Sequence, residues 1–443
     1  MLYKSKNMMG DKALKILIKN GHIIDPANGF DEVNDIYIND GVIAEIGKDI
    51  ELDGEMVQVI DAEGKIVAPG LVDMHVHLRE PGQEYKEDIE TGTRAAVYGG
   101  VTSVACMPNT EPVCDNETVV RYIKERAKEV GYVNVFPVGA ISKGLEGKYL
   151  AEIGEMAFNG AVAISDDGHP VENSGLMRRA IEYSEMFDIP VISHCEDRAL
   201  GEGDMNEGAV ATEMGLRGIS PAAEEIMAAR DILVAESIGA RVHIAHISTK
   251  NTVELVRQAK KRGVRVTCET CPHYFSLTEE ACLGFNTNAK MNPPLRTRED
   301  VRAIKEGLKD GTIDCIVTDH APHHPDEKDC EFGNAKNGIV GLETSLGLGI
   351  KYLVKEGWLT MSELIEKMSK NPAEILGIAK GTLSVGRGAD IVIFDPETAW
   401  TVEIDKLHSK SKNSPFDGFS LYGKPEYVIV GGETVIYKGE LMK

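Results

Sequence analysis

Eight short segments rich in apolar and β-branched residues recur along the middle of the chain, and each is followed by a stretch long enough to hold a helix. Strand–helix alternation predicts a parallel sheet, because parallel neighbours need a crossover connection. Eight such units in about 310 residues predict an α/β fold, a (β/α)8 TIM barrel over residues 70–379, with a doubly wound open sheet as the alternative. The eight segments span residues 70–78, 101–109, 133–142, 160–168, 188–197, 240–248, 264–273 and 314–323.

Two of the intervening stretches carry the end signals of a helix. Residues 116–131 place Asn116 at the N-cap position, apolar residues at helical spacing, and Gly131 as the stop. Residues 251–263 follow the same pattern, with Asn251 and Gly263 as the expected ends. These stretches support helices between the strands.

Both ends of the chain have a different pattern. Residues 13–69 read as short strands, with Asn-Gly at 20–21, Asp-Gly at 40–41 and Glu-Gly at 63–64 as hairpin signals. The tail beyond about residue 380 returns to short apolar runs separated by glycines. We therefore expect one small β-sandwich domain, built from residues 1–69 plus 380–443, beside a catalytic barrel of residues 70–379.

Charge and composition restrict the partners. The formal net charge of −23 repels phosphate backbones, so nucleic acid is not an expected partner. No run approaches the roughly 20 apolar residues of a membrane helix. Residues 1–12 lack the apolar core of a signal peptide, and we expect them to be frayed. The eight cysteines then predict free thiols, Cys268 and Cys271 included, and a reducing, cytoplasmic location.

Side chains of the metal-binding type follow five of the eight expected strands. In a barrel the active site lies at the carboxyl ends of the strands, where these residues fall. Side chains at positions i and i+2 of a strand share a face, so His75 and His77 can bind one cation together. The candidates are His75 and His77, then Asp166 or Asp167, then His194, His246 and Asp319.

The same alternation limits the set. Only one of Asp166 and Asp167 can face the site, and spacing leaves the choice open. His243 and His320 fall out of phase with the chosen histidine and aspartate on their strands, so we leave them out. A lone strand histidine is more often a hydrogen-bonded core residue than a ligand, but so many candidates at one end of one sheet favour a site.

Imidazoles and carboxylates without thiolates favour zinc. The number of candidates exceeds the need of one catalytic zinc with an open position, so two metal ions sharing a carboxylate fit better. Such a site generates hydroxide from water at neutral pH. A carboxylate on the eighth strand, Asp319, could then relay the proton to a leaving nitrogen.

Several motifs extend this pattern into a family resemblance. The His-x-His of the first strand, single histidines on strands five and six and the aspartate on strand eight resemble the amidohydrolase superfamily. The stretches "GLVDMHVHLREPG", "MPNT", "SDDG", "MNPPLR", "TDHAPH" and "GIVGLET" narrow the resemblance to the class I dihydroorotase family, and they extend over nearly the whole chain. The resemblance implies reversible conversion of N-carbamoyl-L-aspartate to L-dihydroorotate in de novo pyrimidine biosynthesis, with a metal-bound hydroxide as nucleophile in ring opening.

The resemblance also implies roles for single residues. One zinc ion would be held by His75, His77 and Asp319, and the other by His194 and His246. Family spacing favours Asp167 over Asp166 as the bridge, in place of the carboxylated lysine of many relatives. Asp319 would also be the general acid and base. The substrate-binding residues would be Arg79, Asn109, Asn292 and His323, with Arg79 clamping the ring carboxylate.

Alternatives remain at each level. A hydantoinase or an allantoinase is the nearest enzyme alternative, although neither substrate carries a ring carboxylate. A non-catalytic scaffold that assembles with aspartate carbamoyltransferase is the alternative from another class. We expect a homo-oligomer, and association of an active enzyme with that transcarbamoylase is also compatible with the sequence. Arg79 could instead form a surface ion pair with Glu80 or Glu84. Residues 323–338 could be a flexible loop over the site or a solvated connection.

Overall fold

The computed structural model describes residues 15–52 and 57–442. The expectation of a frayed terminus over residues 1–12 lies outside these ranges. Among the described residues, no helix combines the length and the apolar character that a membrane crossing requires. All eight cysteines are free thiols, as predicted, and seven of them are buried.

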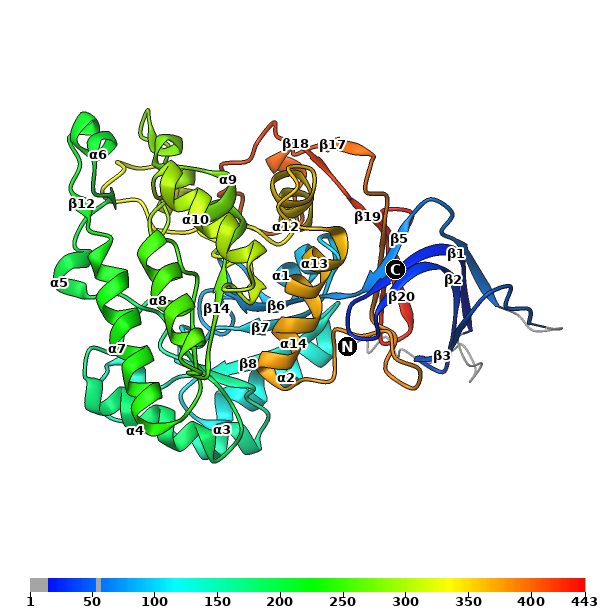
Figure 1. Ribbon diagram of the computed structural model, residues 1–443, viewed down its shortest axis with the longest axis horizontal. Helices are drawn as coiled ribbons and strands as arrows, with labels where there is room; N and C mark the ends of the chain where they lie inside the picture. Colours follow the sequence, from blue (N-terminus) through cyan, green and yellow to red (C-terminus); the bar gives the residue numbers. More distant parts are fainter. Residues whose placement is uncertain (1–14, 53–56, 443) are drawn as a thin grey trace, which may run out of the picture.

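Eight parallel strands form one sheet in the order of the chain, and each lies inside one of the expected segments (Figure 1). The sheet closes on itself where Val76 pairs with His320 and the His77 N–H donates to the His320 carbonyl at 2.9 Å. This closure confirms the (β/α)8 barrel and excludes the open sheet. The strands are β6 (Leu71–Val76), β7 (Val101–Cys106), β8 (Asn134–Gly139), β9 (Ala163–Ser165), β10 (Val191–Ser193), β13 (Val242–Ile244), β14 (Val266–Thr270) and β15 (Cys315–Ile316).

Helices connect these strands and cover the barrel. Asn116 caps α2 and Gly131 ends it, as predicted. The predicted start of α8 was wrong: Thr249, not Asn251, is the cap, because its side chain accepts a hydrogen bond from the Thr252 N–H. The main helices are α1 (Ile89–Tyr98), α2 (Glu117–Val130), α3 (Ile153–Phe158), α4 (Ser174–Glu185), α7 (Ala222–Ile238), α8 (Lys250–Lys261), α10 (Arg298–Lys309), α12 (Ser345–Gly349), α13 (Met361–Ile365) and α14 (Asn371–Leu376).

Short elements decorate the carboxyl ends of the barrel strands. Between β10 and α7 the chain makes an excursion that lies at the left of Figure 1. It consists of α5 (Arg198–Gly201), β11 (Met205–Asn206), α6 (Ala209–Met214) and β12 (Gly218–Ile219). Two further short helices follow the last strands, α9 (Pro272–Ser276) after β14 and α11 (Pro325–Lys328) after β15.

A nine-stranded sheet unites the two ends of the chain beside the barrel (Figure 1). Of the hairpin signals, Asp40-Gly41 joins β2 to β3 as predicted. The other two predictions were wrong. Asn20-Gly21 lies at a register shift within β1, and Glu63-Gly64 separates β4 from β5, which both pair with β1 in parallel. The strands are β1 (Ile16–Asp25), β2 (Phe30–Asn39), β3 (Val42–Gly47), β4 (Gln58–Asp61), β5 (Ile66–Pro69), β16 (Ile391–Phe394), β19 (Pro425–Val430), β20 (Glu433–Tyr437) and β21 (Glu440–Leu441).

Alternation along β16 joins this sheet to the barrel. Ile391 and Ile393 belong to the core of the nine-stranded sheet, whereas Val392 and Phe394 pack into the large core that the barrel helices share. Successive side chains of a strand point to opposite faces, so one strand serves both cores. Between β16 and β19 the chain leaves the sheet and forms β17 (Ala399–Thr401) and β18 (Ser420–Tyr422). The domain boundaries at residues 69/70 and 379/380 stay a prediction.

Candidate active site

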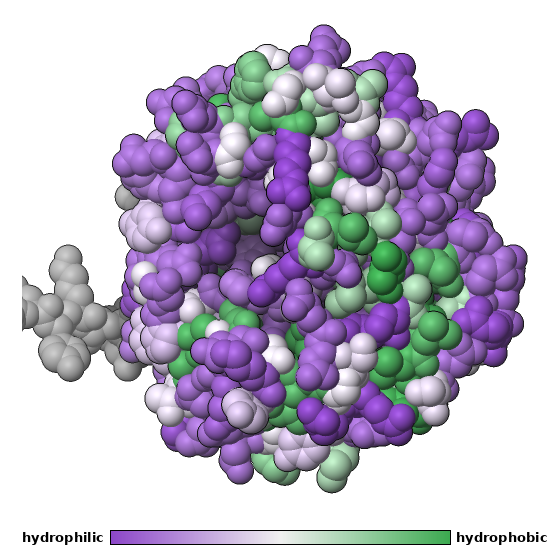
Figure 2. All heavy atoms as spheres, turned by 90° about the vertical axis from the view of Figure 1, so that its left-hand side faces the viewer, coloured by the Kyte–Doolittle hydropathy of each residue, from purple (hydrophilic) through white to green (hydrophobic). Residues whose placement is uncertain are grey.

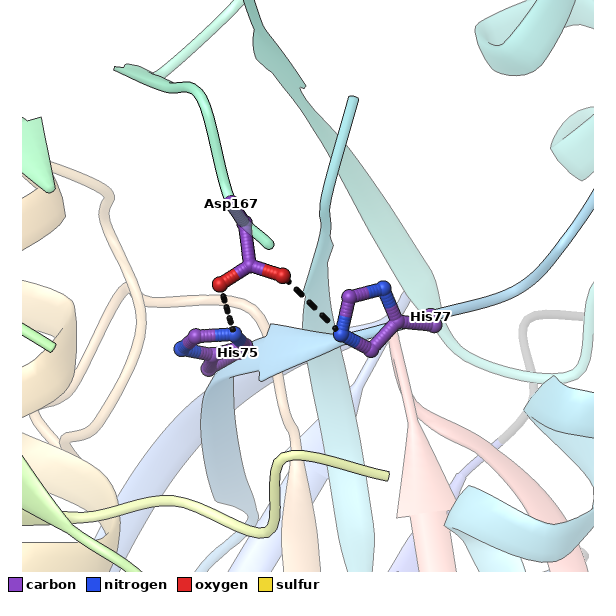
Figure 3. A group of neighbouring side chains, drawn as sticks. All are labelled: His75, His77 and Asp167. Carbon is purple, nitrogen blue, oxygen red and sulfur yellow. Dashed lines mark ion pairs between the residues drawn. The ribbon is translucent and has the colours of Figure 1, made fainter. Parts of the chain in front are cut away.

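Four of the six residues predicted as metal ligands, all histidines, surround the carboxylate of a fifth, Asp167. Asp167 Oδ1 lies 3.2 Å from His75 Nε2, and Asp167 Oδ2 lies 3.4 Å from His77 Nε2 (Figure 3). Two more imidazoles face Oδ1, with His194 Nδ1 at 3.6 Å and His246 Nε2 at 3.5 Å. None of these five residues is more than 5% exposed. His75 lies in β6, and the other four residues lie one or two positions beyond the ends of β6, β9, β10 and β13.

The sixth residue, Asp319, completes the cluster from the end of the eighth strand. Its Oδ1 lies 3.1 Å from His77 Nε2 and 3.7 Å from His75 Nε2. Burial raises the pKa of this carboxyl, but the hydrogen bond with His77 and nearby imidazoles outweigh burial and leave the pKa below its usual value. Asp319 is therefore ionised at neutral pH and can accept a proton.

Asp166 and Asp167 point in different directions. Asp166 turns away from the histidines, and its Oδ1 accepts hydrogen bonds from the backbone N–H groups of Ile141 at 2.8 Å and Ser142 at 2.9 Å. Asp167 is therefore the carboxylate that faces the imidazoles.

In His75 and His77, the ring nitrogen that faces away from Asp167 contacts a side-chain oxygen. His75 Nδ1 lies 2.5 Å from Glu269 Oε1, and Glu269 Oε2 lies 3.1 Å from His243 Nε2. His77 Nδ1 lies 2.9 Å from Asn109 Oδ1. A ring nitrogen that donates to such an acceptor leaves the opposite nitrogen free to bind a metal.

Sequence reasoning missed two supporting carboxylates. Glu269 lies in β14, a strand for which we named no candidate, and Glu196 lies two residues beyond His194, with Oε2 at 3.3 Å from His194 Nε2. A charged residue inside an apolar, β-branched segment was the available signal for Glu269, because a buried charge needs a partner. Nothing local marks Glu196.

The cluster fits a metal centre. His75 Nε2 and Asp167 Oδ1 are buried and have no hydrogen-bond partner within residues 15–52 and 57–442, a costly state unless a ligand satisfies them. Three overlapping triads place their ligand atoms within 4.8 Å of one another: His75–His77–Asp167, His75–His246–Asp319 and Asp167–His194–His246. Sharing of Asp167 between two triads suits two neighbouring ions.

The electrostatics of the cluster favour a cation. Burial lowers the pKa of His194, but the neighbouring carboxylates of Asp167 and Glu196 outweigh burial and raise the pKa to about 10. Burial likewise opposes protonation of His75, and the charges of Glu269 and Asp167 still hold its pKa well above the usual value. A metal ion and a proton compete for the same imidazole nitrogen. The carboxylates that stabilise a protonated histidine here would therefore also stabilise a bound metal ion.

Three candidate residues adopt left-handed backbone conformations. The φ angles are +60° at Arg79, +28° at His246 and +46° at Asp319. Non-glycine residues rarely adopt positive φ, and such strain gathers at functional sites where surrounding contacts enforce it. The backbone itself thus marks these positions as constrained.

Arg79 is buried rather than part of a surface ion pair. Its Nε donates to the Pro322 carbonyl at 3.2 Å, and its Nη2 lies 3.5 Å from His323 Nε2. Glu80 instead accepts from Arg126 Nε at 2.9 Å and from the Ile89 N–H at 2.9 Å. The alternative of an ion pair with Glu80 or Glu84 was wrong. Arg79 and His323 therefore form one edge of the site.

The remaining predicted substrate residues border the cluster. Asn109 contacts His77, as described above, and Asn292 Nδ2 donates to Glu196 Oε2 at 3.3 Å. Burial, with the charge of Arg79 next in size, lowers the pKa of His323 to about 2, so this ring is neutral. The structure brings all four predicted substrate residues to the edge of the metal-type cluster.

Residues 323–338 fold into a hydrogen-bonded loop. Lys328 is buried, and its Nζ donates to the carbonyls of Lys336 at 2.7 Å and Gly338 at 3.2 Å. The loop is therefore more than a solvated connection.

Figure 2 shows the face that carries α5, α6 and β12, where the surface is hollowed and the rim of the hollow is mostly hydrophilic.

Comparison with known proteins agrees with this geometry. A family described as Dihydro-orotase-like matches residues 64–252, and one described as Amidohydrolase family matches residues 241–436. A dihydroorotase from Acetivibrio thermocellus is 62% identical over 96% of this chain and all of its own length. Dihydroorotases from Ruminiclostridium cellulolyticum and Geobacter metallireducens are each 59% identical over 97% and 96% of this chain and all of their own lengths. The chain belongs to the dihydroorotase family.

Solved structures of hydantoinases share the fold of this chain. L-Hydantoinase (dihydropyrimidinase) from Arthrobacter aurescens superposes with a TM-score of 0.86 at 28% identity, over 97% of each chain. D-Hydantoinase (dihydropyrimidinase) from Thermus sp. gives a TM-score of 0.82 at 26% identity, over 96% of each chain. The fold is thus shared with hydantoinases, and the higher sequence identity lies with dihydroorotases. Family membership confirms the resemblance drawn from the motifs.

Proposed function

We propose that this chain is a zinc-dependent dihydroorotase that interconverts N-carbamoyl-L-aspartate and L-dihydroorotate in pyrimidine biosynthesis. The observation that carries the proposal is the buried cluster around Asp167 with the Arg79–His323 pair at its edge. A cation site beside a buried guanidinium suits a cyclic amide that carries a carboxylate.

The metal ligands in this proposal are the six clustered residues. His75, His77 and Asp319 would hold one zinc ion, His194 and His246 would hold a second, and Asp167 would bridge the two. Two zinc ions, when bound, would polarise the amide carbonyl and lower the pKa of a water molecule. Nitrogen and carboxylate ligands at buried strand ends support zinc, and the shared Asp167 supports two ions.

Asp319 moves the proton in this proposal. In ring opening it takes the proton from the attacking water and gives it to the ring nitrogen as the carbon–nitrogen bond breaks. In ring closure it takes a proton from the ureido nitrogen as that nitrogen bonds to the carbon of the protonated side-chain carboxyl group, and it gives this proton to the hydroxyl oxygen, which leaves as water. Its lowered pKa and its place beside His77 support this role, because the proton acceptor must start ionised.

The substrate contacts follow from the positions of four residues. Arg79 would clamp the ring carboxylate with two parallel hydrogen bonds, and Asn109 would help to hold it. His323 would lie beside that carboxylate, and Asn292 would bind the ring amide. Hydantoin and allantoin lack the carboxylate, so the buried charge of Arg79 favours dihydroorotate over both.

The setting of the enzyme is part of the proposal. We propose a cytoplasmic location, a homo-oligomeric state and, as a second assembly, association with aspartate carbamoyltransferase. The free thiols support a reducing compartment.

The test is ring opening of L-dihydroorotate by the purified protein. We expect activity that disappears after chelation and returns with zinc, with hydantoin and allantoin as much poorer substrates. Zinc analysis of the same samples should give up to two ions per chain. No turnover by zinc-loaded protein would refute the proposal for the isolated chain.

A further inference from the structure

A polar segment far from the barrel in sequence crosses the edge of the site. Residues 408–414, "HSKSKNS", form an irregular segment between β17 and β18, which we name the C-terminal strap. Ser409, Ser411 and Asn413 are at most 4% exposed, whereas Lys410 between them is exposed. Polar side chains at alternating buried positions must be satisfied by hydrogen bonds, and all three are.

The first half of the strap binds the loop that follows β6. Ser409 Oγ donates to Glu87 Oε2, the Lys410 N–H donates to Glu87 Oε1 at 3.1 Å, and Ser411 Oγ donates to the Lys86 carbonyl at 2.7 Å. Glu87 is fully buried, and its Oε2 also lies 3.4 Å from Nε2 of His320, the residue after Asp319. The strap therefore reaches the end of the eighth strand through Glu87.

The second half of the strap binds the other side of the same strand end. Asn413 Oδ1 accepts the His323 N–H at 3.0 Å, while Asn413 Nδ2 donates to the carbonyls of Ala321 at 2.9 Å and Gly338 at 3.0 Å. The Val340 N–H donates to the Asn413 carbonyl at 2.9 Å. One asparagine thus joins both ends of the 323–338 loop to the end of the eighth strand.

The two halves enclose the segment that carries Asp319 and His323. Asp319 has a φ angle of +46°, and a strained backbone persists only where the surrounding contacts over-determine it. Glu87 holds the segment at His320 and Asn413 holds it at Ala321 and His323. These contacts come from residues distant in sequence, and they touch no candidate metal ligand directly.

We propose that the C-terminal strap is a positioning element for the proposed reaction, with Asn413 setting His323 for substrate binding and Ser409, through Glu87, setting Asp319 for proton transfer. The proposal rests on the proposed function. It assigns a role in the active site to a stretch of chain between β17 and β18.

The test compares two variants at the two ends of the strap in the full-length, zinc-loaded enzyme. Asn413→Ala should raise KM for L-dihydroorotate at least tenfold while kcat changes less than threefold. Ser409→Ala removes one of the hydrogen bonds that hold Glu87 and should lower kcat at least threefold. KM should stay within twofold, because the Lys410 N–H still binds Glu87 and the contact of Asn413 with His323 is unchanged. Uniform destabilisation does not produce opposite splits of KM and kcat.

Asn371→Ala is the matched control. Asn371 Nδ2 also donates to a backbone carbonyl, that of Asp314 at 2.8 Å, but Asp314 precedes β15 and so lies at the opposite end of the barrel strands. The KM and kcat of Asn371→Ala should stay within twofold of the wild-type values. Hydrogen exchange gives a readout independent of turnover: amides of residues 320–340 should exchange faster in Asn413→Ala and not in Asn371→Ala.

The outcomes separate the two proposals. Wild-type protein that binds zinc but does not open dihydroorotate refutes the proposed function, and the exchange comparison still decides whether the strap orders residues 320–340. An active wild type with both strap variants within twofold in KM and kcat, or with equal losses in Asn371→Ala, overturns the strap proposal. If Asn413→Ala does not fold, the kcat of Ser409→Ala decides.

Discussion

Replacement of Glu269 by glutamine should weaken zinc binding about 10- to 100-fold. Glu269 is fully buried, and its two oxygens bind one histidine each, His75 Nδ1 at 2.5 Å and His243 Nε2 at 3.1 Å. Burial raises the pKa of Glu269, but the charge of His75 and hydrogen bonds from both rings hold it well below the usual value. The carboxylate is therefore a permanent acceptor behind His75.

The magnitude follows from what glutamine cannot do. Its side chain has the shape of glutamate but one oxygen, so its NH2 group must face one of the two histidines. A lost hydrogen bond to a charged group costs about 1.5–3 kcal/mol, or about 10- to 150-fold in an equilibrium constant. His75 then no longer has an enforced tautomer that leaves Nε2 free for zinc.

A competition titration of metal-free protein with a chromophoric zinc chelator measures the effect. Glu224→Gln is the matched control, because Glu224 is also buried and accepts from the Ser248 N–H at 3.0 Å and the Thr249 N–H at 3.2 Å. The control should lose stability but keep its zinc affinity. Wild-type zinc affinity in Glu269→Gln would refute the role of Glu269 in orienting His75.

Four further predictions concern single residues in and beside the site. Arg79→Lys should raise KM for L-dihydroorotate about tenfold or more, because lysine cannot bind a carboxylate through two parallel hydrogen bonds; steady-state kinetics with an unchanged KM would contradict this. Asp319→Asn should lower kcat by at least about 100-fold, and zinc analysis of the same sample separates lost proton transfer from lost metal. Burial raises the pKa of Asp166 from 3.8 to about 6, so the stability it contributes is present below pH 3.8 and lost as pH rises through about 6. Asp166→Asn should therefore gain stability relative to wild type across that window in urea unfolding, whereas Asp167→Asn should keep its fold and lose zinc.

The barrel could be predicted because its signals are local. Each strand is a short apolar run, each crossover has room for a helix, and the order of the strands in the sheet is their order in the chain. The hairpin prediction at Asn20-Gly21 was wrong because the same dipeptide occurs in two kinds of structure. Asn20-Gly21 favours positive φ, which serves a bulge as well as a hairpin, and only the partner strands decide between them.

The candidate ligands could be predicted because chemistry and position coincide at strand ends. Asp167 and His194 lie within two residues of the ends of strands whose sequences are clearly of the β type, so the barrel brings them together. The choice between Asp166 and Asp167 needed the backbone, because β9 ends at Ser165 and alternation beyond a strand end is not assured. Family spacing, rather than periodicity, indicated Asp167.

The supporting residues escaped prediction for a physical reason. Glu269 and Asn413 are buried polar residues whose partners lie far away in the chain: His75 is 194 positions from Glu269, and His323 is 90 positions from Asn413. Hydrophobic periodicity reports which apolar side chains are buried, and it says nothing of a polar side chain whose burial is balanced by a remote hydrogen bond. Side chains that bind a metal can share a strand end or a motif, but the groups that fix their geometry must approach from behind, from other elements. Positioning groups are therefore the part of an active site that a single sequence conceals, and unusual backbone angles such as that of Asp319 are where to search for them.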